Sequence, residues 1–461
     1  MLFSSISFLY YFFAILLVVY FIVPKNKGKN VVLFVASLLF YAYGEPKVIW
    51  LLLVSCIVSY YAGIFMEKYP KYRKALLLLA ILVEFGFLLY YKYAGFFLDI
   101  ARNFVDVPYL RVVMPIGISF FTFQTMSYVA DVYMGNVQVA HSLLDYSTYV
   151  CLFPQLVAGP IVRYSDVAIE LEMRTHSYDQ FGYGVKRFII GLGKKVLLAN
   201  MLGELVDVLT GLPVSVLSYW VQAIAYAMQI FFDFAGYSDM AIGLGSIFGF
   251  KFPENFNYPF IAKSVTEFWR RWHMTLSGWF RDYVYIPLGG NRVSVAKHIR
   301  NILVVWFLTG FWHGANWNYM IWGCYFGVLL LLEKFVYGKY LQKHPVLGWV
   351  TTQFLVVISF VIFRQEDLSM LFAQLQGMFS FSIPLYTTEA LYYVQSYFVL
   401  FVIALFACTP LPKQTLSQWV ERLEIYKVYD VIEVVMLLGL FFFITASLVH
   451  ASFNPFLYFR F

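Results

Sequence analysis

The stretch NILVVWFLTGFWHGANWNYMIWG, residues 301–323, decides the fold class, because it continues for its whole length without a charged side chain. A helix needs about 20 apolar residues in a row to cross a lipid bilayer. Three basic residues precede the stretch: Arg292, Lys297 and Arg300. Because cytoplasmic loops are enriched in Lys and Arg, we predict a membrane helix that enters from the cytoplasm.

The rest of the chain has a similar composition. Of its 461 residues, 61% are hydrophobic, 21% aromatic and 13% charged, whereas soluble domains average about 45–50% apolar and about 25% charged residues. Disordered chains have low hydrophobicity, and outer-membrane barrels show short alternating segments where this chain has continuous apolar runs. We therefore predict an all-α polytopic membrane protein, a single domain over residues 1–461 with about 11–13 membrane elements.

The charges fit a multi-pass protein of a bacterial inner or cytoplasmic membrane. The net charge of +7 is explained by the bias of basic residues toward cytoplasmic loops, and not by binding of nucleic acid. Positive charge follows the first apolar run, 6–23, and does not precede it, so we predict a retained helix with its N-terminus outside. By the same rule, segments 24–30 and 410–430 are predicted inside, 365–389 outside, and 453–461 outside or at the interface.

The middle of the chain is less regular. The run 147–162 is short and is interrupted by Pro154 and Pro160, which predicts a re-entrant element buried in protein or lining water. Segment 181–207 mixes basic and apolar residues and is predicted to lie at the cytoplasmic interface. The run 215–250 is long enough for two helices.

The four cysteines lie inside apolar runs, and none forms a C-x-x-C pair. We predict that they are small packed or lipid-facing residues and not disulfides or metal ligands. No cluster of metal-ligand type occurs in the sequence, so neither a metal nor a bound cofactor is predicted.

His313 is the first candidate for chemistry. At about 1.5 Å per residue, the helix from Arg300 to His313 measures about 20 Å, which places the imidazole near or beyond the middle of a bilayer core of about 30 Å. An ionisable residue at that depth is a functional candidate, and a neutral imidazole can act as a general base near neutral pH. The alternative is a structural histidine that is hydrogen-bonded between helices. Trp312 and Asn316 beside it are predicted to line a substrate site.

Segment 264–292, SVTEFWRRWHMTLSGWFRDYVYIPLGGNR, is the second candidate. Drawn as one helix, it gathers its large aromatic residues on one face, and His273, Arg270 and Arg281 on another. It is either an amphipathic helix at the membrane surface or a helix that lines a polar cavity. The Pro-Leu-Gly-Gly sequence at 287–290 indicates a broken element.

Two acids within an apolar run, Asp233 and Asp239, form the third candidate, because buried charges in membranes are costly and usually functional. They are predicted to orient a histidine, to bind a substrate hydroxyl or to pair with Arg270 or Arg281; purely structural pairing is the alternative. The sequence contains none of the usual nucleotide-binding, zinc-protease or serine-hydrolase motifs. A histidine without an activated Ser or Cys favours direct attack by a substrate hydroxyl.

Several motifs resemble those of a known family: FYAYGEP at 40–46, FPQLVAGPIVRYSD at 153–166, FDFAGYSDMAIGLGSIFGFKFPENFNYPF at 232–260, FWRRWHMTLSGWFRDYVYIPLGGNR at 268–292, FLTGFWHGANW at 307–317 and NPFLYFRF at 454–461. The chain resembles the membrane-bound O-acyltransferases, in particular their alginate O-acetyltransferase-like bacterial branch. The resemblance implies that His313 is catalytic and that His273 is a second functional position. It also implies a ring of helices around a thin central pore, with the acyl donor entering from the cytoplasm and the product delivered outside.

On this basis we expect a membrane O-acetyltransferase that passes an acetyl group from a cytoplasmic thioester, acetyl-CoA, toward an extracytoplasmic polysaccharide such as alginate, another exopolysaccharide or a cell-wall glycan. The resemblance also implies an extracytoplasmic acetyltransferase partner protein. The donor phosphates are expected to meet basic residues at the cytoplasmic mouth: Lys194, Lys195, Arg292, Lys297 and Arg300.

Two alternatives stay open. One is D-alanyl transfer to teichoic acid from a carrier protein, which a cousin branch of the family performs. The other is a transporter or flippase for polysaccharide precursors, which should show inverted repeats, and none is visible in the sequence.

Overall fold

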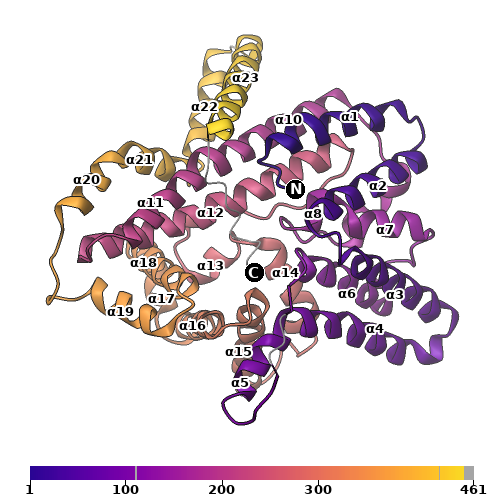
Figure 1. Ribbon diagram of the computed structural model, residues 1–461, viewed down its shortest axis with the longest axis horizontal. Coiled ribbons are helices and arrows are strands. Elements are labelled where there is room, and N and C mark those ends of the chain that lie inside the picture. Colours follow the sequence, from indigo (N-terminus) through magenta and orange to yellow (C-terminus); the bar gives the residue numbers. More distant parts are fainter. Residues whose placement is uncertain (109–111, 425, 451–461) are drawn as a thin grey trace. The chain divides into compact units, whose positions relative to one another are not determined.

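The computed structural model describes residues 1–108, 112–424 and 426–450, and in these ranges it consists of helices and connecting segments without a strand (Figure 1). The predicted all-α class is therefore confirmed. The chain divides into two compact units. The first unit comprises residues 1–188 and 237–254, and the second comprises residues 189–236 and the described part of 255–457. The single domain predicted over 1–461 stays a prediction, and segment 453–461 lies outside the described residues.

The first unit is a bundle of helices in which α3 packs against α4, α6 and α7, and α2 packs against α7. Its helices are η1 (Ser7–Phe12), α1 (Phe13–Ile22), α2 (Asn26–Gly44), α3 (Ile49–Lys68), α4 (Arg73–Leu88), η3 (Leu89–Tyr93), α5 (Ala94–Ala101), α6 (Ile118–Met134), α7 (Leu143–Cys151), α8 (Phe153–Leu156), α9 (Tyr164–Met173) and α10 (Tyr178–Gly193). The last of these continues into the second unit.

The predicted interruption of the run 147–162 is present. Helix α7 ends at Cys151, α8 is a single turn, and no helix follows before Tyr164. Residues 146–162 are all buried, so their backbone groups need partners inside the protein. Side chains supply some of them: Ser37 Oγ accepts from the Phe153 N–H at 3.0 Å, and the Tyr149 hydroxyl donates to the Val162 carbonyl at 3.0 Å. Non-helical backbone is tolerated at membrane depth under this condition.

The second unit contains these helices: η4 (Lys194–Ala199), α11 (Asn200–Thr210), α12 (Val216–Ile247), η5 (Pro259–Ile261), α13 (Val265–Trp269), α14 (Met274–Phe280), η6 (Arg281–Tyr285), α15 (Val295–His313), α16 (Trp317–Leu332), η7 (Glu333–Tyr337), α17 (Gly338–Lys343), α18 (Pro345–Arg364), α19 (Leu368–Met378), α20 (Thr388–Ser396), α21 (Phe398–Ala407), α22 (Leu411–Leu423) and α23 (Tyr426–His450). The last part of α12 belongs to the first unit.

The run 215–250 is long enough for two helices, but it does not divide. The run forms one helix of 32 residues, α12. Its sequence has no proline after Val216 and no polar turn segment, so nothing in it ends the helix. The helix is about 48 Å long at 1.5 Å per residue, which is longer than the thickness of a bilayer core. Length was the reason to consider two helices.

Among the residues that the structure describes, five helices are long and apolar enough to cross a membrane: Ile49–Lys68, Pro70–Ala101, Trp317–Lys343, Pro345–Arg364 and Tyr426–His450. The pair α20 and α21, bent by 53°, adds a sixth if it forms one span. These helices confirm a multi-pass membrane protein. The larger number of membrane elements and the ring around a pore stay predictions.

The cysteines are free thiols, and Cys56, Cys151 and Cys408 are buried while Cys324 is exposed. Cys56 Sγ and Cys151 Sγ lie 3.8 Å apart, as two thiols in contact. The predicted role as small packed residues is confirmed for the three buried ones.

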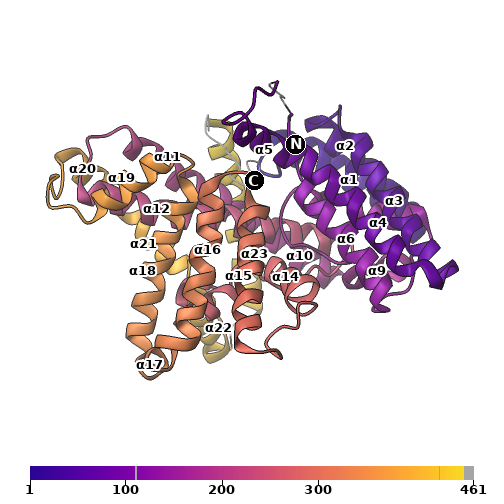
Figure 2. The same ribbon diagram turned by 90° about the horizontal axis from the view of Figure 1, so that it is seen from below.

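Helices α15 and α16 lie side by side and cross at two glycines (Figure 2). A Cβ atom on Gly310 would lie 2.3 Å from the Tyr319 carbonyl oxygen, and one on Gly323 would lie 2.3 Å from the Trp306 carbonyl oxygen. Backbone atoms cannot move aside as a flexible side chain can. The two glycines therefore permit the close crossing on which the end of α15 depends.

We expect Gly310→Ala to lower the free energy of unfolding by about 1–3 kcal/mol, the usual cost of an overpacked contact. Thermal unfolding of the purified protein in detergent measures the loss. The matched control is Gly439→Ala in α23, where a new Cβ would meet no atom within 4 Å. Equal melting temperatures for the two variants would contradict the close crossing.

Candidate active site

His313 is the last residue of α15, before the turn that leads into α16. Its side chain is 2% exposed. The Nδ1 atom lies 2.7 Å from the Thr309 carbonyl oxygen, one turn back in the same helix. Because a carbonyl oxygen can only accept, Nδ1 carries the hydrogen and donates it. In the neutral ring, Nε2 then holds the lone pair that a general base needs.

Aromatic rings from three helices enclose His313. The ring centroids of Trp312, Trp322 and Phe363 lie 5.0, 4.9 and 5.4 Å from the imidazole centroid. All three side chains are buried. Such an apolar enclosure keeps bulk water from the ring, so charges and hydrogen bonds near it act at low dielectric.

His273 lies at a break in the chain and not in a continuous helix. It is the N-cap of α14 and has φ = 43°, a left-handed conformation that non-glycine residues seldom adopt. The prediction that 264–292 forms one helix with an aromatic and a cationic face is therefore wrong at this point. His273 is fully buried, whereas Arg270 and Arg281 are exposed. His273 and the two arginines therefore differ in burial and do not form one polar strip.

Asn255 holds His273 in this conformation. Its Oδ1 atom lies 3.1 Å from His273 Nδ1 and accepts a hydrogen bond from the Thr275 hydroxyl at 2.9 Å. The Asn255 carbonyl accepts from the Met274 N–H at 3.0 Å. Nδ1 of His273 is thus the donor, as it is in His313, and Nε2 is again the basic atom. A left-handed residue costs about 1–3 kcal/mol and persists where its surroundings fix it.

The structure places the two histidines against the same tryptophan. The Trp312 ring lies 6.1 Å from the His273 ring and 5.0 Å from the His313 ring. Phe234 of α12 packs edge-on against His273, with centroids 4.6 Å apart. Burial, and then the charge on His313, lower the pKa of His273 well below its usual range. Both imidazoles therefore belong to one buried site. His273 lies outside the five helices long enough to cross a membrane.

A cavity of about 260 Å³ lies between α13, α14, η6 and α15, and neither histidine lines it. Arg270 and Arg281 line it together with apolar and aromatic side chains. Thr309, whose carbonyl holds His313, lines it as well. The cavity thus connects two exposed cations with the helical turn that carries the predicted base.

The two predicted acids pair with basic residues other than Arg270 and Arg281, which corrects the expected pairing. In the second unit, Asp233 forms a buried ion pair with Lys195 at 2.6 Å. In the first unit, Asp239 pairs with Arg187 at 2.7 Å, and Arg187 also binds Glu254. Arg187 was not among the predicted site residues, although it lies in the basic segment 181–207.

The physical reason for the first pairing is close packing between α12 and the segment before it. A Cβ atom on Gly236 would lie 2.7 Å from the Gly191 carbonyl oxygen. This approach brings Lys195 within reach of Asp233. Arg281 instead pairs with its neighbour Asp282, with Nε and Oδ1 2.7 Å apart.

The five basic residues predicted to bind the donor phosphates differ in their exposure to solvent. Lys195 is buried in its ion pair, with 3% of its side chain exposed, so its predicted place at a basic mouth is wrong. Lys194 is half-buried. Arg292, Lys297 and Arg300 are exposed at or just before the start of α15. Of the other predicted residues, Asn316 caps α16 by accepting from the Trp317 N–H at 2.6 Å.

Comparison with known proteins decides the family. The family model described as MBOAT, membrane-bound O-acyltransferase, matches residues 38–365. The chain belongs to this family. The match includes both histidines, the cavity beside α15 and the buried Lys195–Asp233 pair. The family resemblance inferred from the motifs is therefore confirmed, and the chain is an O-acyltransferase.

Individual relatives agree with this membership. The "Probable alginate O-acetylase AlgI" of Pseudomonas aeruginosa is 41% identical over 83% of this chain and 75% of its own length. The "Peptidoglycan O-acetyltransferase" of Helicobacter pylori is 34% identical over 75% of this chain and 73% of its own length. The "Teichoic acid D-alanyltransferase" of Bacillus subtilis is 31% identical over 55% of this chain and 67% of its own length.

Proposed function

We propose that this O-acyltransferase moves an acetyl group from acetyl-CoA in the cytoplasm toward a polysaccharide outside the membrane, with His313 as general base. The observation that carries the proposal is the hydrogen bond from His313 Nδ1 to the Thr309 carbonyl. It leaves Nε2 as the basic atom of a buried ring, next to a cavity that opens toward exposed arginines.

The reaction needs two proton transfers and one displacement. Nε2 of His313 takes the proton of an acceptor hydroxyl, and the oxygen forms a bond with the thioester carbonyl carbon. The C–S bond breaks, and the proton on His313 passes to the departing thiolate. The products are an acetyl ester and a free thiol. General-base assistance of this kind contributes about 10²–10⁴-fold in rate.

His273 is proposed to support this exchange. Its Nδ1 atom is engaged with Asn255, so its Nε2 atom is the one that can act. The two imidazoles share Trp312 as a neighbour. Protonation of one ring disfavours protonation of the other. The pair would therefore carry one extra proton at a time. The ring without this proton stays basic, and the ring that holds it stabilises the leaving thiolate.

The donor is proposed to enter through the cavity between α14 and α15. A thioester donor with phosphates is too polar to cross the hydrocarbon core, so its charged end must stay at the cytoplasmic mouth. Arg270 and Arg281 line the cavity, and Arg292, Lys297 and Arg300 lie exposed at the start of α15. Guanidinium groups bind phosphate oxygens with two hydrogen bonds in a fixed geometry.

We expect Arg270→Gln and Arg281→Gln each to raise KM for acetyl-CoA about tenfold, because each removes a charge-assisted hydrogen bond worth about 1.5–3 kcal/mol. The kcat should change little, since the contact is equally strong in the ground state and the transition state. Steady-state kinetics on reconstituted protein measures both constants. The control is Arg422→Gln, an exposed arginine of α22 away from the cavity. An unchanged KM in both cavity variants would exclude this entrance.

The acceptor is proposed to be an extracytoplasmic glycan, such as alginate, another exopolysaccharide or a cell-wall glycan. The named substrates of two relatives, alginate and peptidoglycan, are both polysaccharides outside the cell membrane. An extracytoplasmic partner protein is proposed to receive the acetyl group first and to place it on the glycan.

The test is reconstitution of the purified protein in vesicles with labelled acetyl-CoA inside and an acceptor outside. Label should appear on the acceptor, or in hydrolysed donor. Transport of an intact glycan without acetyl transfer would refute the proposal. A second candidate, D-alanyl transfer from a carrier protein, is favoured only by the weaker match to the D-alanyltransferase. Transfer from a D-alanyl carrier with none from acetyl-CoA would select it.

A further inference from the structure

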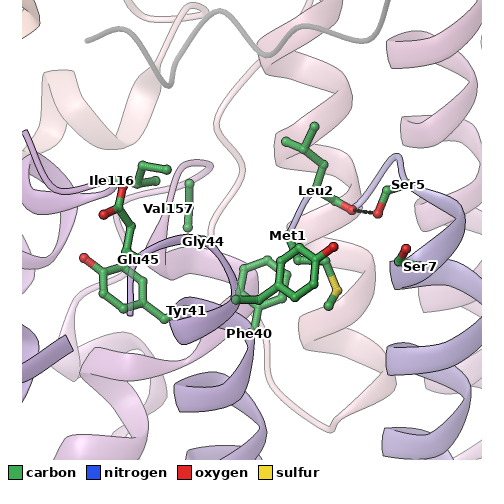
Figure 3. A pocket seen from close by; sticks show the side chains of 11 residues that line it. Met1, Leu2, Ser5, Ser7, Phe40, Tyr41, Gly44, Glu45, Ile116 and Val157 are labelled. Atoms are coloured by element: carbon green, nitrogen blue, oxygen red, sulfur yellow. Dashed lines mark hydrogen bonds between the residues drawn. The ribbon is translucent and has the colours of Figure 1, made fainter. Parts of the chain in front are cut away.

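The motif FYAYGEP, residues 40–46, has no part in the site described above, yet it forms most of one wall of another cavity. This cavity measures about 350 Å³ and lies in the first unit, where the C-terminal end of α2 meets the N-terminal segment (Figure 3). Phe40, Tyr41, Tyr43, Gly44 and Glu45 all line it. A volume above about 300 Å³ is large enough for a small-molecule ligand.

One end of the cavity carries a buried hydroxyl that needs a partner. The Tyr41 side chain is 3% exposed, and its hydroxyl makes no hydrogen bond with any part of the chain that the structure describes. Figure 3 shows the Glu45 carboxylate at the same end of the cavity as this hydroxyl. The Ile116 N–H donates to that carboxylate and fixes it. A buried polar group without a partner destabilises the protein, so a ligand that bonds Tyr41 offsets this cost.

The rest of the cavity combines an apolar wall with a second polar end. The Phe40 ring lies in the middle of the view, and Ser5 and Ser7 lie at the side opposite Glu45 (Figure 3). The Ser5 hydroxyl donates to the Leu2 carbonyl at 2.7 Å. The cavity therefore offers aromatic surface between two places where hydrogen bonds can form.

We propose that this cavity binds a sugar ring without a carboxylate, as one unit of the polysaccharide acceptor. A pyranose has an apolar C–H face that packs on an aromatic wall and a rim of hydroxyls that donate to a carboxylate and accept from a phenol. A lipid chain would leave Tyr41 and Glu45 without hydrogen-bond partners. A uronate would bring a second carboxylate to Glu45, and like charges repel.

The position of the cavity agrees with an acceptor site. Helix α2 begins at the basic segment 24–30, which is predicted to be cytoplasmic. The topology predicted from the sequence then puts its other end, at Gly44, on the extracytoplasmic side, where the proposed glycan acceptor lies. This inference rests on the proposed function, because it takes the acceptor to be a polysaccharide. Among the acceptors named above, it favours glycans whose sugars carry no carboxylate.

Binding is measured by isothermal titration calorimetry on full-length His313→Ala protein in lipid nanodiscs, so that no acetyl transfer can occur. The probes are cellotetraose, chitotetraose and a tetramannuronate. We expect one of the two uncharged oligosaccharides to bind. Tyr41→Phe, which removes only the hydroxyl, and Glu45→Gln, which removes only the charge, should each weaken that binding about tenfold. Tyr90→Phe, at an exposed tyrosine of η3 outside the cavity, should leave it unchanged.

Three results would overturn the inference: no binding of either uncharged oligosaccharide, equal binding by Tyr41→Phe, Glu45→Gln and the control, or tighter binding of tetramannuronate. Thermal unfolding of each variant shows whether it is folded. The assay also separates this inference from the proposed function. Sugar binding without acetyl transfer by the wild-type protein would remove only the proposed function. Normal transfer to a glycan without sugar binding would remove only the cavity.

Discussion

Replacing His313 by Asn should lower the rate of acetyl transfer by about 10³-fold or more, within the range that loss of a general base produces. The Asn side-chain amide can still donate to the Thr309 carbonyl, as His313 Nδ1 does at 2.7 Å. It offers nothing in place of the Nε2 lone pair. The variant therefore keeps the local hydrogen bond and loses only the base. His313→Ala should lose as much activity and some stability besides.

The measurement is the single-turnover rate with labelled acetyl-CoA, together with the affinity for the donor. Donor binding should be nearly unchanged in both variants, because the proposed phosphate contacts are made by arginines and not by the imidazole. The matched control is His141→Ala, an exposed histidine of the first unit, which should have the wild-type rate. Activity within about tenfold of wild type in His313→Asn would remove His313 as the base.

The sequence predicted those features that depend on neighbouring residues alone. The break at 147–162 follows from Pro154 and Pro160. The run 301–323, by contrast, was predicted as one membrane helix, and this is wrong: it forms the last part of α15 and the first part of α16, with a turn at 314–316 between them. The sequence placed His313 about 20 Å along a helix that starts beside basic residues, and the structure shows that this helix ends at His313. In each confirmed case the decisive information is a proline, a charge or an apolar run within the segment itself.

The missed features depend on contacts between distant segments. Nothing in the residues around His273 shows that it takes a left-handed conformation, because the group that holds it, Asn255, lies in a preceding loop. A helical projection of 264–292 therefore placed His273 on the wrong face. Likewise, a carboxylate in an apolar run indicates that a basic residue pairs with it, but the sequence does not show which basic residue. The approach of Gly236 to Gly191 decided that Lys195, and not an arginine, meets Asp233.

This pair supports the second prediction with a large effect. Lys195 and Asp233 are almost fully buried, with 3% and 1% of their side chains exposed. Removing one partner leaves the other charge in a medium of low dielectric, which costs about 3–5 kcal/mol. We expect Asp233→Asn and Lys195→Met each to lower the free energy of unfolding by about this amount. Asp99→Asn, in the exposed pair with Arg102, should change it by less than about 1 kcal/mol.

The double variant Lys195→Met with Asp233→Leu separates a structural pair from a chemical one. Replacing both charges by apolar groups removes the desolvation cost along with the attraction, so most of the lost stability should return. Thermal unfolding in detergent measures the stability, and acetyl transfer by the same samples measures function. A stable double variant with normal activity means that the pair only holds η4 against α12. A stable double variant that has lost activity would give Asp233 the role in substrate binding that its place in the apolar run suggested. Single variants as stable as the wild type would contradict the buried pair itself.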